Sequence, residues 1–176
     1  MRNHNGMRPH DVVVLLKIIS LNKEGIEKRG LTNKALAESL KISPAEITHS
    51  LNRSAFAGLL EPLHKRVNRH ALLDFLKHGI KYVFPDQPSK ILRGIPTAHS
   101  AKPLSDMIQS SESYVWASLK ENIKGQEITP LYNKVSEIIE NDMFLYQSLA
   151  LIDAIRVGRN REYMIANQEL EKLIIE

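Results

Sequence analysis

The chain has 176 residues, a mass of 20.0 kDa, and 43% hydrophobic and 25% charged residues, which is typical of globular rather than disordered proteins. It holds no cysteine, which excludes disulfides, thiolate metal sites, iron–sulfur clusters and cysteine nucleophiles. No apolar run approaches the roughly 18–20 residues of a membrane span. The run over 12–21 lacks the cleavage site of a signal peptide. We therefore expect a cytoplasmic protein with no membrane partner.

The net charge of +4 is unevenly distributed along the chain. Residues 1–70 hold 12 Lys and Arg against 6 Asp and Glu, a net charge of +6, whereas residues 71–176 hold 12 against 14, a net charge of −2. A basic first part indicates a module that binds a polyanion, joined to a part with another role. Chance variation in surface charge is the alternative interpretation.

Two helices are predicted early in the chain, after a short leader over residues 1–8. Pro9 suits a first helical turn, and apolar residues from Val12 to Ile19 recur at helical spacing, which predicts a helix over about 10–24. After a polar connector over 25–30, Thr32 is the expected N-cap of a helix over 33–40.

The strongest local signal is the run Ser-Pro-Ala-Glu at 43–46. A cap residue, a first-turn proline and a glutamate in the third helical position together form the pattern of a capping box. They predict a helix that starts at residue 44 and that Gly58 ends. The apolar pair at 59–60 then predicts a short strand that Pro62 stops.

Two helices joined by a tight turn and followed by a strand have the order of a helix-turn-helix. The residues TNKALAESLKISPAEITHSLNRSAFAGLLEP resemble the winged helix-turn-helix domains of bacterial transcription regulators, broadly of the MarR type. The resemblance covers about residues 9–62. The chain departs from it after HKRVN, where a helix over about 69–78 follows, so we expect a wing that is shortened or replaced by this helix.

The remaining chain is predicted as a strand over 80–84, a linker or long loop rich in Pro and Gly up to about 113, and an irregular stretch over 122–132. Helices follow over about 136–157, with a break near residues 141–142, and over 160–175. The expected fold is mainly α with a small β wing. It consists of a winged helix-turn-helix domain (1–84), a linker or long loop (85–112) and a helical C-terminal region that supplies a dimer interface (113–176).

The outward face of the helix that starts at 44 carries side-chain types that read bases in a major groove. Arginine forms paired hydrogen bonds with guanine, asparagine does so with adenine, and threonine or alanine contacts the thymine methyl group. A solvated helix face is the alternative, although such faces usually hold more Glu and Lys. We predict contact with DNA by this face, whose residues are Ala45, Glu46, Thr48, His49, Asn52 and Arg53.

Phosphate contacts are predicted at helix starts and after the strand. Free N–H groups at a helix start favour an anion. Ser43 lies at the start of the third helix, although its side chain is also needed for capping. The basic residues after the strand are either backbone contacts or part of an exposed turn, and the sequence leaves both open. The remaining candidates are Thr32, Asn33 and Lys34 at the second helix and Lys65, Arg66 and Arg69 after the strand.

Other chemistry finds little support in the sequence. His70, Asp74 and His78 recur every fourth residue, but they lack a fourth ligand nearby, so a polar helix face is favoured over a metal site. A His/Ser/Asp set near residue 100 lacks the G-x-S-x-G elbow of hydrolases, and glycine-rich nucleotide loops are absent. We expect no enzyme activity, no metal and no cofactor.

The resemblance implies a sequence-specific transcriptional regulator, a repressor that binds a palindromic operator in double-stranded DNA as a homodimer. Its third helix would enter the major groove, and basic residues would fix the register. The alternative is a protein-interaction adaptor or an antitoxin-like partner that uses the same fold without touching DNA. The sequence identifies no small-molecule effector.

Overall fold

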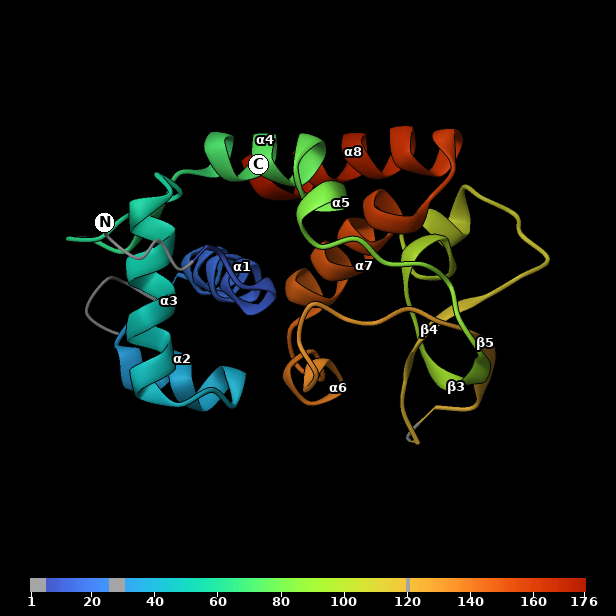
Figure 1. Cartoon of the computed structure of the whole chain (residues 1–176), viewed down its shortest axis with the longest axis horizontal. Coiled ribbons are helices and arrows are strands. Elements are labelled where there is room, and N and C mark those ends of the chain that lie inside the picture. Colours follow the sequence, from blue (N-terminus) through green and yellow to red (C-terminus); the bar gives the residue numbers. More distant parts are fainter. Residues whose placement is uncertain (1–5, 26–30, 120) are drawn as a thin grey trace. The chain divides into compact units, whose positions relative to one another are not determined.

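A computed structural model describes residues 6–25, 31–119 and 121–176 (Figure 1). The chain is mostly helical with a few short strands, and its contacts divide it into two compact units, Met1–Leu72 and Leu73–Glu176. Most of the predicted leader and connector lies outside the described residues. In the described part of the chain, no helix is long and apolar enough to cross a membrane.

Helices dominate the described residues of the first unit. α1 packs against both other helices, and every residue from Asp11 to Ser20 is buried, so α1 is the central element of this core (Figure 1). The sequence pattern predicted burial of one face of α1, whereas the structure buries its whole circumference over this range. The elements are α1 (Pro9–Lys23), α2 (Asn33–Leu40), α3 (Pro44–Phe56), β1 (Leu60–Glu61) and β2 (Arg66–Val67).

The predicted bounds of these helices are confirmed because local signals determine them. Pro9 is the first residue of α1, and Pro44 is the first residue of α3. Gly58 follows α3 with a φ of +76°, the left-handed conformation that ends helices. β1 and β2 form an antiparallel hairpin whose strands have only two residues each.

Helices and a small sheet form the second unit. α4 (Arg69–His78) begins in the first unit and continues into the second. α7 packs along α8. The further elements are α5 (Ile80–Val83), β3 (Ile91–Pro96), η1 (Ala98–Ser100), η2 (Leu104–Asp106), β4 (Tyr114–Ala117), β5 (Ile123–Glu127), α6 (Val135–Ile138), α7 (Met143–Val157) and α8 (Asn160–Ile175).

The three strands of the second unit close on one another. β3 pairs antiparallel with both β4 and β5, and β4 pairs with β5 in parallel. A side chain at Gly94 would overlap with the carbonyl oxygen of Trp116, and one at Gly125 would lie too close to the carbonyl of Ser113. Glycine is therefore required at these two places because the backbones approach closely.

Three predictions for the second unit differ from the structure. Residues 80–84 form the short helix α5 instead of a strand, with only Ile80 buried, because β-branched residues form a strand only where a partner strand pairs with them. The range expected as a linker contains β3, and the range expected as irregular contains β5. Gly94 and Gly125 lie inside strands, at the points of close backbone approach, and Pro96 is the last residue of β3.

A buried carboxylate joins the sheet to α7. Asp153 Oδ2 accepts hydrogen bonds from Thr97 Oγ1 (2.9 Å) and Trp116 Nε1 (2.6 Å), and Asp153 Oδ1 accepts one from Arg156 Nη1 (2.7 Å). All four residues are buried. Because both oxygens of Asp153 are satisfied by the protein, this cluster stabilises the second unit and leaves no acceptor for a ligand.

Candidate nucleic-acid interface

Two capped helix starts define the candidate interface in the first unit. Thr32 Oγ1 accepts from Ala35 N–H at 3.0 Å at the start of α2, and Ser43 Oγ accepts from Glu46 N–H at 3.2 Å at the start of α3. Lys41 ends α2 in the left-handed conformation, with a φ of 56°, and so makes the tight turn between the helices. The predicted caps are confirmed, and both hydroxyls are used within the fold.

Asn33 and Thr48 link the two helices directly. Asn33 Nδ2 donates to Thr48 Oγ1 at 3.1 Å, and the Thr48 hydroxyl donates to Pro44 O at 3.0 Å. The Asn33 amide, one of the predicted phosphate ligands, therefore bonds to α3. This hydrogen bond connects α2 to α3 directly, and the start of α3 stays exposed to solvent.

The outer face of α3 is polar and exposed. Ile47, Ser50, Leu51 and Ser54 are buried on the opposite side, as helical periodicity requires. The exposed face is Ala45, Thr48, His49, Asn52 and Phe56, and we call it the α3 face. It contains four of the six residues predicted for base contact.

Arg53 and Glu46 do not belong to the α3 face. The Arg53 guanidinium donates from Nε to Asp11 Oδ2 (2.9 Å) and from Nη2 to Asp11 Oδ1 (2.8 Å) and Glu46 Oε1 (2.6 Å). Asp11 is fully buried, and only 10% of the Arg53 side chain is exposed. Arg53, assigned to a base by the sequence, thus holds α3 against α1. Glu46 joins this cluster and does not close a capping box.

The contacts between Arg53 and its carboxylate partners favour the charged forms of Glu46 and Arg53. The hydrogen bond from Arg53 outweighs the opposing effect of burial and, with the His10 hydrogen bond and the charges of Arg53 and Arg8, lowers the pKa of Glu46 to about 2. The hydrogen bond to Asp11 raises the pKa of Arg53. Glu46 and Arg53 are therefore both ionised near neutral pH.

The predicted basic residues differ in how accessible they are. Lys34 is exposed on α2, Arg66 is exposed on β2, and Arg69 is half-exposed at the first residue of α4. Lys65 is directed inward, where its Nζ donates to Leu31 O at 2.6 Å, and burial lowers the pKa of Lys65. Lys34 and Arg66 are therefore better placed than Lys65 to meet a phosphate.

Two exposed apolar residues and one buried acid were not singled out from the sequence. Phe56 is 69% exposed at the end of the α3 face, and Leu63 is 82% exposed between β1 and β2. Helical spacing from His49 and Asn52 could have placed Phe56 on this face. Asp11, alone at the start of an apolar helix, was the signal for a buried partner of Arg53.

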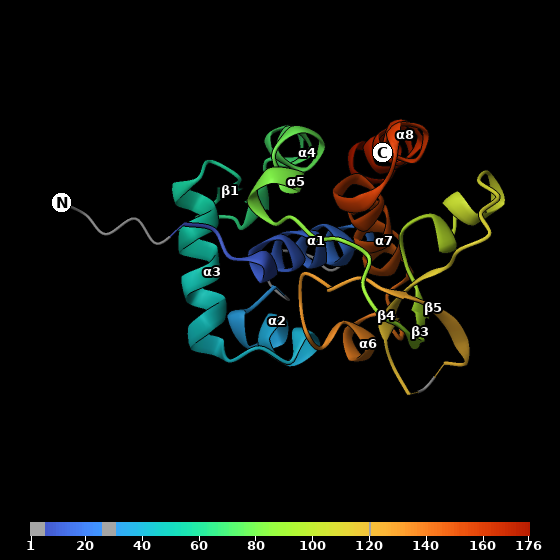
Figure 2. The same cartoon turned by 45° about the vertical axis from the view of Figure 1, so that its right-hand side comes forward.

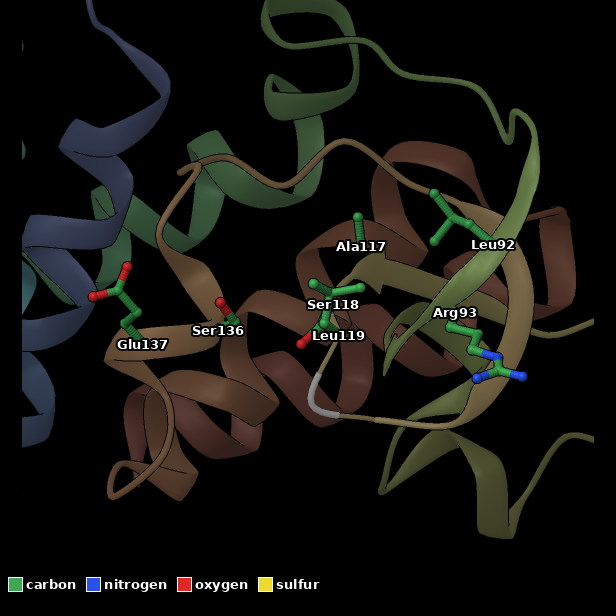
Figure 3. A pocket seen from close by; sticks show the side chains of 7 residues that line it. All are labelled: Leu92, Arg93, Ala117, Ser118, Leu119, Ser136 and Glu137. Carbon is green, nitrogen blue, oxygen red and sulfur yellow. The ribbon is translucent and has the colours of Figure 1, made fainter.

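The second unit has an open hollow of about 870 Å³ (Figure 3). Leu92, Ala117 and Leu119 give it apolar lining, and Arg93 and Glu137 lie at opposite ends of it. Ligand sites direct a few polar groups to one point. The polar groups here do not converge, so we assign no ligand to this hollow.

Within the described residues, no three His, Cys, Asp or Glu side chains gather in a way that could hold a metal ion. His70, Asp74 and His78 are all exposed on α4. The chain matches no protein-family profile, no curated protein and no solved structure. Function is therefore inferred from the side chains of the two units themselves.

Proposed function

We propose that this protein is a sequence-specific DNA-binding transcriptional regulator whose first unit is a winged helix-turn-helix. The observation that carries the proposal is the α3 face, a polar and exposed side of a helix that Ser43 caps and that the Arg53–Asp11 pair holds against α1. A recognition helix has to be rigid, open on one side and of a size that fits the major groove. α3 meets these three requirements.

Each exposed residue of the α3 face has a role in this proposal. Asn52 forms paired hydrogen bonds with an adenine, His49 donates to a base or a phosphate, and Ala45 contacts a thymine methyl group. Thr48, already bonded to Asn33, sets the position of the helix. Arg53 acts as a positioning residue because its guanidinium is bound to Asp11 and Glu46.

Phosphates are contacted by Lys34 and Arg66 and by the free N–H groups at the starts of α2 and α3. The net charge of +6 over residues 1–70 supports binding to a polyanion. We further propose that the protein acts in the cytoplasm as a homodimer on a palindromic operator. It represses by occlusion, and helices of the second unit supply the dimer contact.

The test begins with selection of genomic DNA fragments by the purified full chain at two salt concentrations. The affinity of the Asn52→Ala variant for a selected duplex is then measured, and we expect a loss of about tenfold or more, from a contact of roughly 1–3 kcal/mol. Gln168→Ala, an exposed amide on α8, is the matched control and should leave the affinity unchanged. Failure to enrich any sequence would overturn the proposal.

A protein-interaction adaptor is the second candidate, and the 69% exposure of Phe56 on the α3 face favours it. Aromatic side chains are enriched where proteins bind proteins. Salt separates the two functions, because DNA binding through several phosphates weakens steeply as salt rises. A mainly apolar protein interface would not weaken in this way.

A further inference from the structure

The hairpin of β1 and β2 is anchored in the core of the first unit. Leu60 pairs with Val67, and Asn68 N–H donates to Leu59 O at 2.9 Å, which extends the pairing by one step. The side chains of Leu59, Leu60 and Val67 are all buried. β1 lies beside the end of α3 and contacts it (Figure 2). The hairpin is therefore fixed relative to the α3 face.

One carboxylate holds the tip of this hairpin, residues 62–65. Glu61 Oε1 accepts from Leu63 N–H at 2.9 Å, and Glu61 Oε2 accepts from His64 N–H at 3.1 Å. The same Oε2 lies 2.9 Å from His64 Nδ1. Pro62 has a fixed φ. The backbone on both sides of Leu63 is thus preorganised before any partner arrives.

The cation of the tip is directed inward and its leucine outward. Lys65 Nζ donates to Leu31 O, whereas the side chain of Leu63 is 82% exposed. Single exposed leucines are common on proteins, but Leu63 stands on a backbone that its neighbours hold in place. Transfer of a projecting apolar side chain out of water is favourable, so binding that buries the Leu63 side chain lowers the free energy.

We propose that Leu63 is a wedge that enters the minor groove of the DNA bound by α3 and bends the duplex by partly unstacking one base step. Apolar wedges of this kind kink DNA toward the major groove. Arg66, exposed at the base of the tip, meets the phosphate beside the insertion. The inference rests on the proposed function and deepens it, because it assigns the hairpin the role of bending the site.

The test measures the end-to-end distance of a doubly labelled duplex from the genomic selection by energy transfer. Wild-type protein should shorten this distance. Leu63→Ala should leave the duplex nearly straight and bind it about tenfold more weakly. Leu119→Ala is the matched control, since Leu119 is a fully exposed leucine of the second unit, and it should bend DNA as the wild type does.

A second duplex carries a TpA step at the bent position, because such steps unstack easily. It should raise the affinity of the wild type and leave that of Leu63→Ala unchanged. Equal bending by the wild type and Leu63→Ala would overturn the wedge and leave the proposed function standing. Failure of the wild type to bind any duplex would overturn both. Far-UV circular dichroism checks that the variants are folded.

Discussion

Asp11 is a carboxylate without exposed surface in the first turn of α1, directly before the apolar run from Val12 to Leu16. A buried charge is tolerated only when it is paired and hydrogen-bonded. Its Oδ2 accepts from Arg8 N–H at 2.8 Å, and both oxygens accept from Arg53. The stability of the first unit therefore depends on Arg53 more than on an exposed arginine.

The Arg53→Met variant should lower the free energy of unfolding by about 3–5 kcal/mol, because it leaves the Asp11 charge buried and unpaired. Urea unfolding followed by far-UV circular dichroism measures this loss. Arg66→Met, at an exposed position on β2, is the control and should change stability by less than about 0.5 kcal/mol. Equal losses in the two variants would contradict the role given to the buried pair.

Glu46 makes the stability of the first unit dependent on acid pH. The Arg53 hydrogen bond lowers its pKa from the usual 4.5 to about 2, so the folded state binds this proton less readily than the unfolded state. Its contribution is full above pH 4.5 and is lost as the pH falls toward 2. Urea unfolding at several pH values should show the advantage of the wild type over Glu46→Gln shrinking through this window. A difference in stability between the wild type and Glu46→Gln that stays constant with pH would contradict the lowered pKa of Glu46.

The exposure of side chains on α3 was easier to predict from the sequence than the partners of those side chains. Helical period placed Ala45, Thr48, His49 and Asn52 on one exposed face, because this depends only on neighbours along the chain. Arg53 has the same period, but its partner Asp11 lies 42 positions away. No local pattern contains a contact over such a separation, so the buried pair appears only in the folded structure.

At the scale of elements, helices depend on local signals that the sequence shows, whereas strands depend on distant partners that it does not show. α2, α3, α4 and α8 begin and end where their caps, glycines and apolar stripes predicted. The break expected near residues 141–142 is present, and Asp142 caps α7 by accepting from Leu145 N–H at 2.9 Å. β3 and β5 were missed because a strand requires a partner, and theirs come from distant segments.

A substitution at Gly94 tests the close pairing of β3 with β4. A methyl group there would overlap with the Trp116 carbonyl, so Gly94→Ala should separate β3 from β4 and destabilise the second unit by about 3 kcal/mol. Trp116 is the single tryptophan of the chain and is buried in β4. Its fluorescence during urea unfolding therefore reports on this unit, and the midpoint should fall.

Gly58→Ala is the control for that substitution. No atom lies within 4 Å of a side chain added at Gly58, so the change should cost only the left-handed backbone conformation, about 1 kcal/mol. Circular dichroism measures this loss. If Gly94→Ala were tolerated as well as Gly58→Ala, the close approach of β3 and β4 would be disproved.

At the scale of the whole molecule, charge is segregated between the two units. The boundary at residues 72–73 separates a part with a net charge of +6 from a part with a net charge of −2, since residues 71 and 72 are uncharged. A polyanion is attracted to the first part and repelled weakly by the second. The proposed function therefore requires that phosphate contacts come from the first unit.

The salt dependence of DNA binding tests, one cation at a time, whether the phosphate contacts come from the first unit. Each phosphate contact contributes about one to the slope of log affinity against log salt, so Arg66→Ala should reduce the slope by about 1. Lys124→Ala removes an exposed cation from β5 of the second unit and should leave the slope unchanged. Fluorescence anisotropy of a selected duplex between about 50 and 200 mM salt provides the slopes. If Lys124→Ala lowered the slope as much as Arg66→Ala, the second unit would also contact DNA. DNA contact would then not be confined to the helix pair of the first unit.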